Sequence, residues 1–253
     1  MEAIQNQYGN VTLHKIRHTD GLEELAMLDA EGLRALLTPE VAQEPMQEAR
    51  SAASLGKDVK LVSLNVDGIN TYDKPAAARI ATALNQLLEV GPDVIMLQDV
   101  AIQMLHAAQA VLHDWQLYYW RAHAKDYFLL TAMKGGSGER RDECKVVRFG
   151  QRTRQGRHLL IVKRGQWSFT NTHAESGSTA TDRDNSVWQL HLLSCRADFD
   201  PTHVHVVAGD FNMREGEGHC LRQEGWVDAW ETTNVDAHDE ARTWRRSNCT
   251  ARY

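Results

Sequence analysis

The sequence predicts an α/β protein in which strands form two sheets and helices lie outside them. Short, mostly apolar runs typical of buried strands recur along residues 59–210. Segments with apolar residues three and four positions apart, typical of amphipathic helices, separate several of these runs. A strand, a helix and a second strand succeed one another within residues 60–100. This succession indicates a layered α/β arrangement.

The first half of this region contains two strands and two helices. Residues 60–68 and 92–100 are the predicted strands, and both end in polar residues. Residues 74–91 form the helix between them, which Gly91 ends. A further helix is predicted at residues 101–115.

The second half is richer in strands. Five strands separated by glycine-bearing turns indicate an antiparallel meander. They are predicted at residues 115–123, 127–135, 144–150, 157–165 and 166–176. A helix follows at residues 179–197, and then a buried strand at residues 203–207. The chain breaks after this strand at Ala208-Gly209.

Residues 1–56 differ in character from the rest of the chain. Two helices are predicted there, at residues 20–37 and 39–53, and a small-residue linker follows them. We expect a helical N-terminal extension of unknown role, either a docking module or a lead-in arm. The main domain is then residues 57–253.

Composition limits the class of protein. With 42% hydrophobic and 25% charged residues, the chain has the composition of an ordinary globular protein. It has no apolar run of the ~18 residues that a membrane helix needs, and its first residues do not form a secretory signal. The four cysteines are far apart, which argues against disulfides and zinc. We therefore expect an intracellular protein that does not associate with membranes, and the composition does not decide between the nucleus and the cytoplasm.

The net charge of −6 conceals a basic segment. Residues 134–167 contain ten basic residues and three acidic residues. Such a segment could follow a phosphate backbone, or it could be a solvated loop and edge strand. The sequence leaves both interpretations open.

Polar residues collect where the predicted strands end. They are Asn65, Asp99, His173, Glu175, Ser176, Asp210 and Asn212. Each alone has an ordinary explanation as a turn former, a helix cap or a strand-end histidine. Together they supply the groups that a phosphodiester hydrolase needs: ligands for a divalent cation, a group that aligns water, and donors for developing charge.

Four strings, LNVDG, PDVIMLQDV, NTHAES and VVAGDFNMRE, occur in that order and resemble the motifs of the endonuclease/exonuclease/phosphatase superfamily. The His-x-Glu-Ser string, the arginine after Gly-Asp-x-Asn and the late Thr243-Trp244 favour its tyrosyl-DNA phosphodiesterase 2 branch. The resemblance covers residues 57–253. It implies a four-layer α/β/β/α sandwich of the DNase I-like type.

The resemblance also implies catalytic roles. Asp210 would align or activate the attacking water, and Asn212 would stabilise the phosphate. Asn65 would touch the scissile phosphate or the metal shell, and His173 would contact phosphate oxygens. Asp99 would bind the metal, Mg²⁺ with Mn²⁺ as an alternative.

Three more residues would bind substrate. Ser176 would contact phosphate oxygens, Arg214 would reach the nucleic-acid strand, and Trp244 would line a channel for a single-stranded DNA end. The implied function is a metal-dependent phosphodiesterase in DNA repair that hydrolyses 5′-phosphotyrosyl adducts at single-stranded 5′ termini.

The sequence departs from the branch at two places. Asp99 replaces a glutamate, and the shorter carboxylate predicts weaker metal binding. No Ser-Asp-His string follows Trp244, so we expect the C-terminal strands to be lacking and activity to be very low if these 253 residues are the whole protein. A truncated sequence of a longer protein would explain this ending.

Other functions also fit the motifs. An abasic-site endonuclease or a small phosphoester phosphatase of the same superfamily would use the same residues. A catalytically impaired relative that binds DNA ends or a protein partner is a further alternative.

Overall fold

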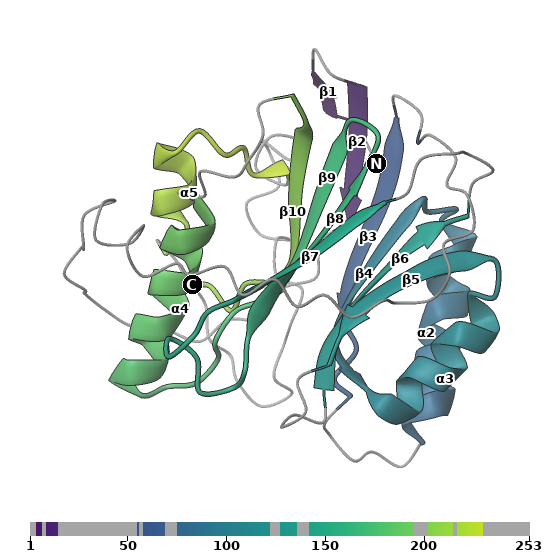
Figure 1. The fold of residues 1–253 in the computed structure, drawn as a ribbon, viewed down its shortest axis with the longest axis horizontal. Helices are drawn as coiled ribbons and strands as arrows, with labels where there is room; N and C mark the ends of the chain where they lie inside the picture. The colour runs from purple at the N-terminus through teal and green to yellow at the C-terminus, as the bar shows by residue number, and fades with distance from the viewer. Residues whose placement is uncertain are drawn as a thin grey trace, which may run out of the picture.

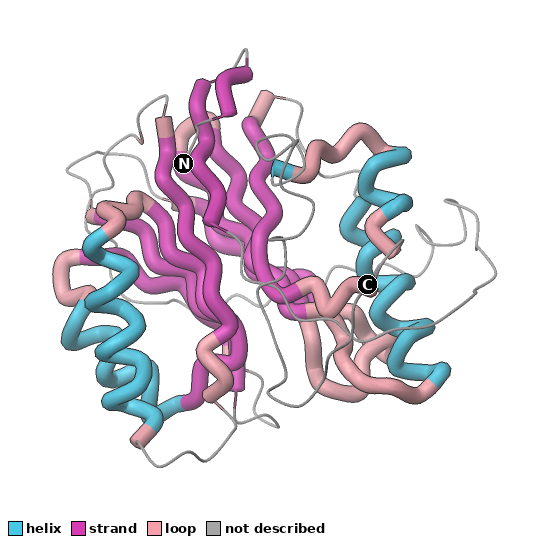
Figure 2. The backbone as a smooth tube through the Cα atoms, turned by 180° about the vertical axis from the view of Figure 1, so that it is seen from behind, coloured by secondary structure: helices cyan, strands magenta, loops and turns pink. Residues whose placement is uncertain are grey.

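The computed structural model describes residues 4–6, 9–14, 55, 58–68, 75–121, 127–135, 142–194, 202–214 and 217–229. Two mixed sheets face each other at the centre of the molecule, and helices cover their outer sides (Figure 1). Seen from behind, the helices again lie at the two flanks and the strands between them (Figure 2). The predicted α/β/β/α sandwich is confirmed.

The first sheet has six strands in the order β1-β2-β3-β4-β6-β5. They are β1 (Ile4–Asn6), β2 (Gly9–His14), β3 (Val59–Asn65), β4 (Val94–Ala101), β5 (Trp115–Trp120) and β6 (Tyr127–Lys134). Strands β2, β3 and β4 are parallel to one another, whereas β1, β5 and β6 pair antiparallel with their neighbours. The polar ends of β3 and β4 therefore meet at one edge, with Asn65 opposite Gln98.

The second sheet has four strands in the order β10-β9-β8-β7. They are β7 (Glu143–Arg148), β8 (His158–Arg164), β9 (Trp167–His173) and β10 (Val204–Asp210). Strands β7, β8 and β9 are antiparallel, whereas β10 is parallel to β9. This parallel register places Asp210 opposite His173.

The predicted meander of five strands is wrong at its middle, because β6 belongs to the first sheet and β7 begins the second. All eight residues of β4 are buried. A buried strand must satisfy its backbone N–H and C=O groups on both edges. Strand β6 therefore completes the ladder beside β4 instead of continuing to β7.

Helices α2 (Ala76–Glu89) and α3 (Ile102–Val111) cover the first sheet, and α4 (Ala180–Ser194) and α5 (His219–Gln223) lie beside the second (Figure 1). Ile80 and Leu84 are the buried residues of α2. Between the sheets, the rings of Trp167 and Phe169 stack with centroids 5.9 Å apart. No helix in the described ranges is long and apolar enough to cross a membrane.

Strands β1 and β2 were not predicted from the sequence. Strand β1 pairs with β2 and β2 pairs with β3, which places residues 4–6 and 9–14 in the first sheet. The helices predicted at residues 20–37 and 39–53 lie outside the described residues. The division of the chain at residue 57 stays a prediction.

Candidate active site

Four of the predicted site residues meet in one cluster at the strand ends. The Nδ2 of Asn65 donates to the Oδ2 of Asp210 at 2.9 Å and lies 3.4 Å from the Oδ2 of Asp99. His173 lies between the same two carboxylates, with Nδ1 3.2 Å from Asp99 Oδ1 and Nε2 3.5 Å from Asp210 Oδ2. The cluster joins strands of both sheets, β3 and β4 to β9 and β10.

A buried polar link lies close to this cluster and joins the two sheets. The Nε2 of Gln98 donates to the Oδ1 of Asn171 at 2.8 Å, and the Nδ2 of Asn171 donates to the carbonyl oxygen of Leu130 at 3.0 Å. Both amide side chains are buried and hydrogen-bonded. A satisfied buried network of this kind holds its neighbours in one arrangement.

The backbone at the cluster adopts a rare conformation. The only non-glycine residues with positive φ in the described part of the chain are Asp67 (49°), Asp99 (55°) and Asn212 (46°). Asp and Asn tolerate this left-handed region better than most residues. At Asp99 the pairing of β4 with β6 is irregular, and this bulge turns the side chain towards the cluster. The aspartate at this position therefore suits its backbone.

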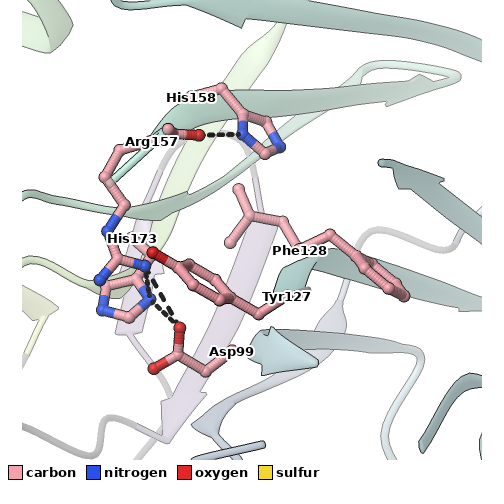
Figure 3. Close-up of a pocket in the computed structure, with 8 residues that line it drawn as sticks. Asp99, Tyr127, Phe128, Arg157, His158 and His173 are labelled. Carbon is pink, nitrogen blue, oxygen red and sulfur yellow. Dashed lines mark hydrogen bonds and ion pairs between the residues drawn. The ribbon is translucent and has the colours of Figure 1, made fainter. Parts of the chain in front are cut away.

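Arg157 supplies a positive charge that the sequence analysis did not place here. Its Nη1 donates to Asp99 Oδ1 at 3.2 Å and lies 2.8 Å from His173 Nδ1. Its guanidinium lies 5.1 Å from the ring centroid of Tyr127 (Figure 3). Burial would raise the pKa of Asp99, but His173 and Arg157 outweigh it and hold that pKa well below its usual range. Asp99 is therefore an ionised carboxylate at neutral pH.

A small recess that opens to solvent lies beside this cation. It is lined by Asp99, Tyr127, Phe128, Leu129, Gly156, Arg157, His158 and His173 (Figure 3). Burial lowers the pKa of His158 to about 4, although a contact of 3.3 Å between its Nδ1 and the carbonyl oxygen of Gly156 opposes this effect. The Nε2 of His158 is buried and has no hydrogen-bond partner among the described residues.

Arg157 and Tyr127 were missed because they do not stand in a recognisable motif. Arg157 counted only as one member of the basic segment. The predicted strands did contain a usable signal: consecutive antiparallel strands place the start of one beside the end of the next. This rule brings Arg157, directly before β8, close to His173 at the end of β9.

The loop after β10 is held by its own hydrogen bonds. The backbone N–H of Asn212 donates to Asp210 Oδ1 at 3.0 Å, and its Nδ2 donates to the carbonyl oxygen of Ala174 at 3.0 Å. Arg183 of α4 donates through Nη1 and Nη2 to the carbonyl oxygen of Asn212, each at 3.2 Å, and pairs with Glu217. Arg183 was not predicted, and it fixes the loop that carries Asp210.

Glu175 and Ser176 bind a neighbouring loop. Glu175 is fully buried and accepts a hydrogen bond of 2.9 Å from the backbone N–H of Arg154. The Oγ of Ser176 donates to the Oε1 of Gln155 at 3.0 Å. These bonds hold the connection between β7 and β8. The role of Ser176 in binding phosphate stays a prediction.

Arg214 is only 8% exposed, and its backbone N–H donates to Glu217 Oε2 at 2.7 Å. Trp244 lies outside the described residues. Their contacts with a nucleic-acid strand therefore stay predictions.

The donor set is compatible with magnesium. No three His, Cys, Asp or Glu side chains in the described ranges form a ready metal cage. Mg²⁺ is, however, commonly held by one or two carboxylates together with water and substrate phosphate oxygens. Arg157 and His173 engage Oδ1 of the ionised Asp99. Its Oδ2 faces the cluster, where the Nδ2 of Asn65 lies 3.4 Å away, and a hard cation would bind at this oxygen.

Comparison with known proteins identifies the family and agrees with the fold. The model of the endonuclease/exonuclease/phosphatase family matches residues 62–245. No curated protein matches the sequence. A solved structure of Danio rerio TDP2 with a single-strand DNA product is 23% identical, with a TM-score of 0.56 over 70% of this chain and 71% of that chain.

Two other solved structures have different activities. An AP endonuclease from Archaeoglobus fulgidus is 15% identical, with a TM-score of 0.51 over 70% of this chain and 74% of that one. A mannosyl-6-phosphatase from Bacteroides thetaiotaomicron is 13% identical, with a TM-score of 0.52 over 68% of this chain and 73% of that one. At such identities the likeness shows the fold alone.

Proposed function

The chain belongs to the endonuclease/exonuclease/phosphatase family, and from this premise we propose that it is a magnesium-dependent phosphodiesterase acting on DNA ends. We further propose that its substrates are 5′-phosphotyrosyl adducts, with manganese as an alternative metal. One observation carries the proposal. A single amide nitrogen, Nδ2 of Asn65, faces both Asp99 and Asp210, at 3.4 and 2.9 Å. An amide donor between two carboxylates from separate sheets is an arrangement suited to phosphoryl transfer.

Each residue has a distinct task. Asp210 orients the attacking water through Oδ2, the oxygen that faces Asn65 and His173 in the cluster, whereas its Oδ1 is held by the backbone N–H of Asn212. Asn65 Nδ2 and His173 Nε2 donate to the phosphoryl oxygens as negative charge develops on them. Asp99 would hold magnesium. When bound, the metal supplies Lewis-acid polarisation of the phosphoryl group.

The tyrosyl substrate is supported by the recess. The Arg157 guanidinium and the Tyr127 ring, 5.1 Å apart, present a cation and an aromatic surface directly beside Asp99 and His173. An aryl leaving group can stack on such a surface, and its departing oxygen can accept from the cation. The TDP2 structure solved with single-strand DNA also supports DNA as the part that keeps the phosphate.

A 5′-tyrosyl oligonucleotide tests the proposal. We expect release of tyrosine with Mg²⁺ and none with EDTA. Asp210→Asn should lower kcat by about 10²–10⁴-fold, whereas Asp114→Asn, in an exposed turn, should leave kcat unchanged. Equal turnover by Asp210→Asn and the unsubstituted protein would contradict the proposed role.

A substrate panel separates the alternatives. Turnover of an abasic duplex or a hexose 6-phosphate, but not of the tyrosyl adduct, would assign the chain to another activity of its family. Salt-dependent binding of DNA ends without turnover in any divalent metal would show a non-catalytic relative.

A further inference from the structure

Two strand edges lie on the same side of the sandwich, beside the recess. Among the described strands, β5 pairs only with β6, and β7 pairs only with β8. The guanidinium of Arg148, the last residue of β7, lies 4.6 Å from the ring centroid of Trp120, the last residue of β5. The Trp120 ring in turn meets His158 edge to face at 5.0 Å. Because the buried His158 lines the recess, contacts between side chains connect the catalytic cluster to the surface formed by β7 and Trp120.

This surface is exposed and positively charged. Every residue of β7 is exposed or half-buried, and Trp120 is half-buried. Strand β7 begins with Glu143, whose carboxylate pairs with Lys163 at 3.5 Å, and residues 144–157 after it contain five basic residues and no acidic residue. Three of these five stack on aromatic rings: the exposed Arg148 on Trp120, the half-buried Arg152 on Trp188 and the buried Arg157 on Tyr127. Ordered guanidiniums attract an anionic partner at a lower entropic cost than mobile ones do.

We propose that the edge of β7, together with Trp120 and Arg148, docks an extended acidic polypeptide that is joined to the scissile phosphate through its tyrosine. The inference rests on the proposed function, which places the tyrosine on the Arg157 side of the cluster.

A polypeptide fits this surface better than a second nucleic-acid strand does. A strand edge presents alternating N–H and C=O groups. Another polypeptide backbone can pair with both kinds of group, whereas a phosphodiester chain offers acceptors only and leaves the C=O groups without a partner. The six residues of β7 span about 20 Å, so a peptide of similar length covers the edge. The basic charge favours acidic side chains on the peptide.

Three substrates built on one oligonucleotide test the inference. They carry at the 5′ phosphate a tyrosine, a tyrosine within an acidic hexapeptide, and the same hexapeptide with Glu replaced by Gln. We expect the unsubstituted protein to favour the acidic peptide over the Gln peptide by about tenfold in kcat/KM. The double variant Trp120→Ala/Arg148→Glu should lose this preference and cleave the simple tyrosyl substrate as before.

Lys134→Glu is the matched control. Lys134 is also exposed and belongs to the same basic segment, but it lies at the far end of β6 from Tyr127. This variant should keep the preference for the acidic peptide. Should the double variant unfold, Lys145→Gln/Arg148→Gln makes the same test with smaller changes.

The outcomes separate the two proposals. If the unsubstituted protein does not cleave the tyrosyl substrate, the proposed function fails. If it cleaves all three substrates equally, or if Lys134→Glu also loses the preference, the function stands and the docking inference is wrong. Fluorescence anisotropy of the adduct-free oligonucleotide tests whether this surface binds nucleic acid instead of a peptide. Weaker binding by the double variant with an unchanged peptide preference would assign the surface to nucleic acid and overturn the inference.

Discussion

Gly209 decides how closely β10 approaches β9, and its replacement by alanine makes a sharp test of the site. It precedes Asp210 and has a φ of +146°. A Cβ at this position would lie 1.9 Å from the carbonyl oxygen of Thr172 and 2.9 Å from its backbone nitrogen. Both atoms belong to the neighbouring strand, so no side chain can move aside to relieve the contact.

Two effects add in Gly209→Ala. The backbone conformation is nearly restricted to glycine and costs about 1–3 kcal/mol for another residue. Relief of the backbone contact requires β10 to shift, which costs about another 1–3 kcal/mol. A total of about 4 kcal/mol lowers Tm by about 8–16 °C in a protein of this size. The same shift moves Asp210 away from Asn65 and His173, so kcat should fall as well.

Gly91→Ala is the control, because Gly91 has a φ of +68° but an added Cβ there meets no atom within 4 Å. It should cost only about 1–2 kcal/mol and leave kcat unchanged. Urea unfolding and cleavage of the tyrosyl substrate measure the two effects. The reasoning is refuted if Gly209→Ala is no less stable than Gly91→Ala, or if it retains full activity.

Two further predictions concern buried charge. His158 has a pKa of about 4 in the folded protein and an ordinary value of 6.5, so the unfolded chain binds more protons between these values. The free energy of unfolding should therefore fall by on the order of 3 kcal/mol as the pH drops from 6.5 to 4. Urea unfolding of His158→Gln should show a weaker dependence of this free energy on pH. The control His113→Gln, at an exposed position, should keep the pH dependence of the unsubstituted protein. Arg164 pairs with Asp142, and both side chains are 3% exposed. Arg164→Met leaves that carboxylate buried without its cation and should lower the free energy of unfolding by about 3–5 kcal/mol. In a double-mutant cycle, Arg164→Met/Asp142→Leu should regain most of this loss. A cost below 1 kcal/mol for the single substitution would show that the pair is not needed.

The predicted elements that agreed best with the structure depend on local patterns. The helix predicted at residues 74–91 is α2, Ala76–Glu89, and the strand predicted at residues 92–100 is β4, Val94–Ala101. Hydrophobic periodicity belongs to the segment itself, so it can be read without knowing the neighbours. Strand partners cannot be read in this way. The separation of β6 from β7 was therefore missed.

The candidate site shows the same division. Residue chemistry and strand ends were enough to single out Asn65, Asp99, His173 and Asp210. The sequence could not show Arg157 as the partner of Asp99, because the two are 58 positions apart and meet only when the sheets pack. Nor could it show positive φ at Asp99, since that conformation depends on the bulge between β4 and β6.

The sequence by itself determined the family, the order of the motifs and the residue types that carry the chemistry, because these depend on identity and local spacing. The tertiary structure alone decided which of these groups meet. It placed the Nδ2 of Asn65 within 2.9 Å of Asp210 across 145 positions of the chain. It also left β7 as an edge strand, with Arg148 stacked on Trp120. Such contacts arise from the packing of two sheets, and no local pattern encodes a distance between segments that lie far apart in the chain.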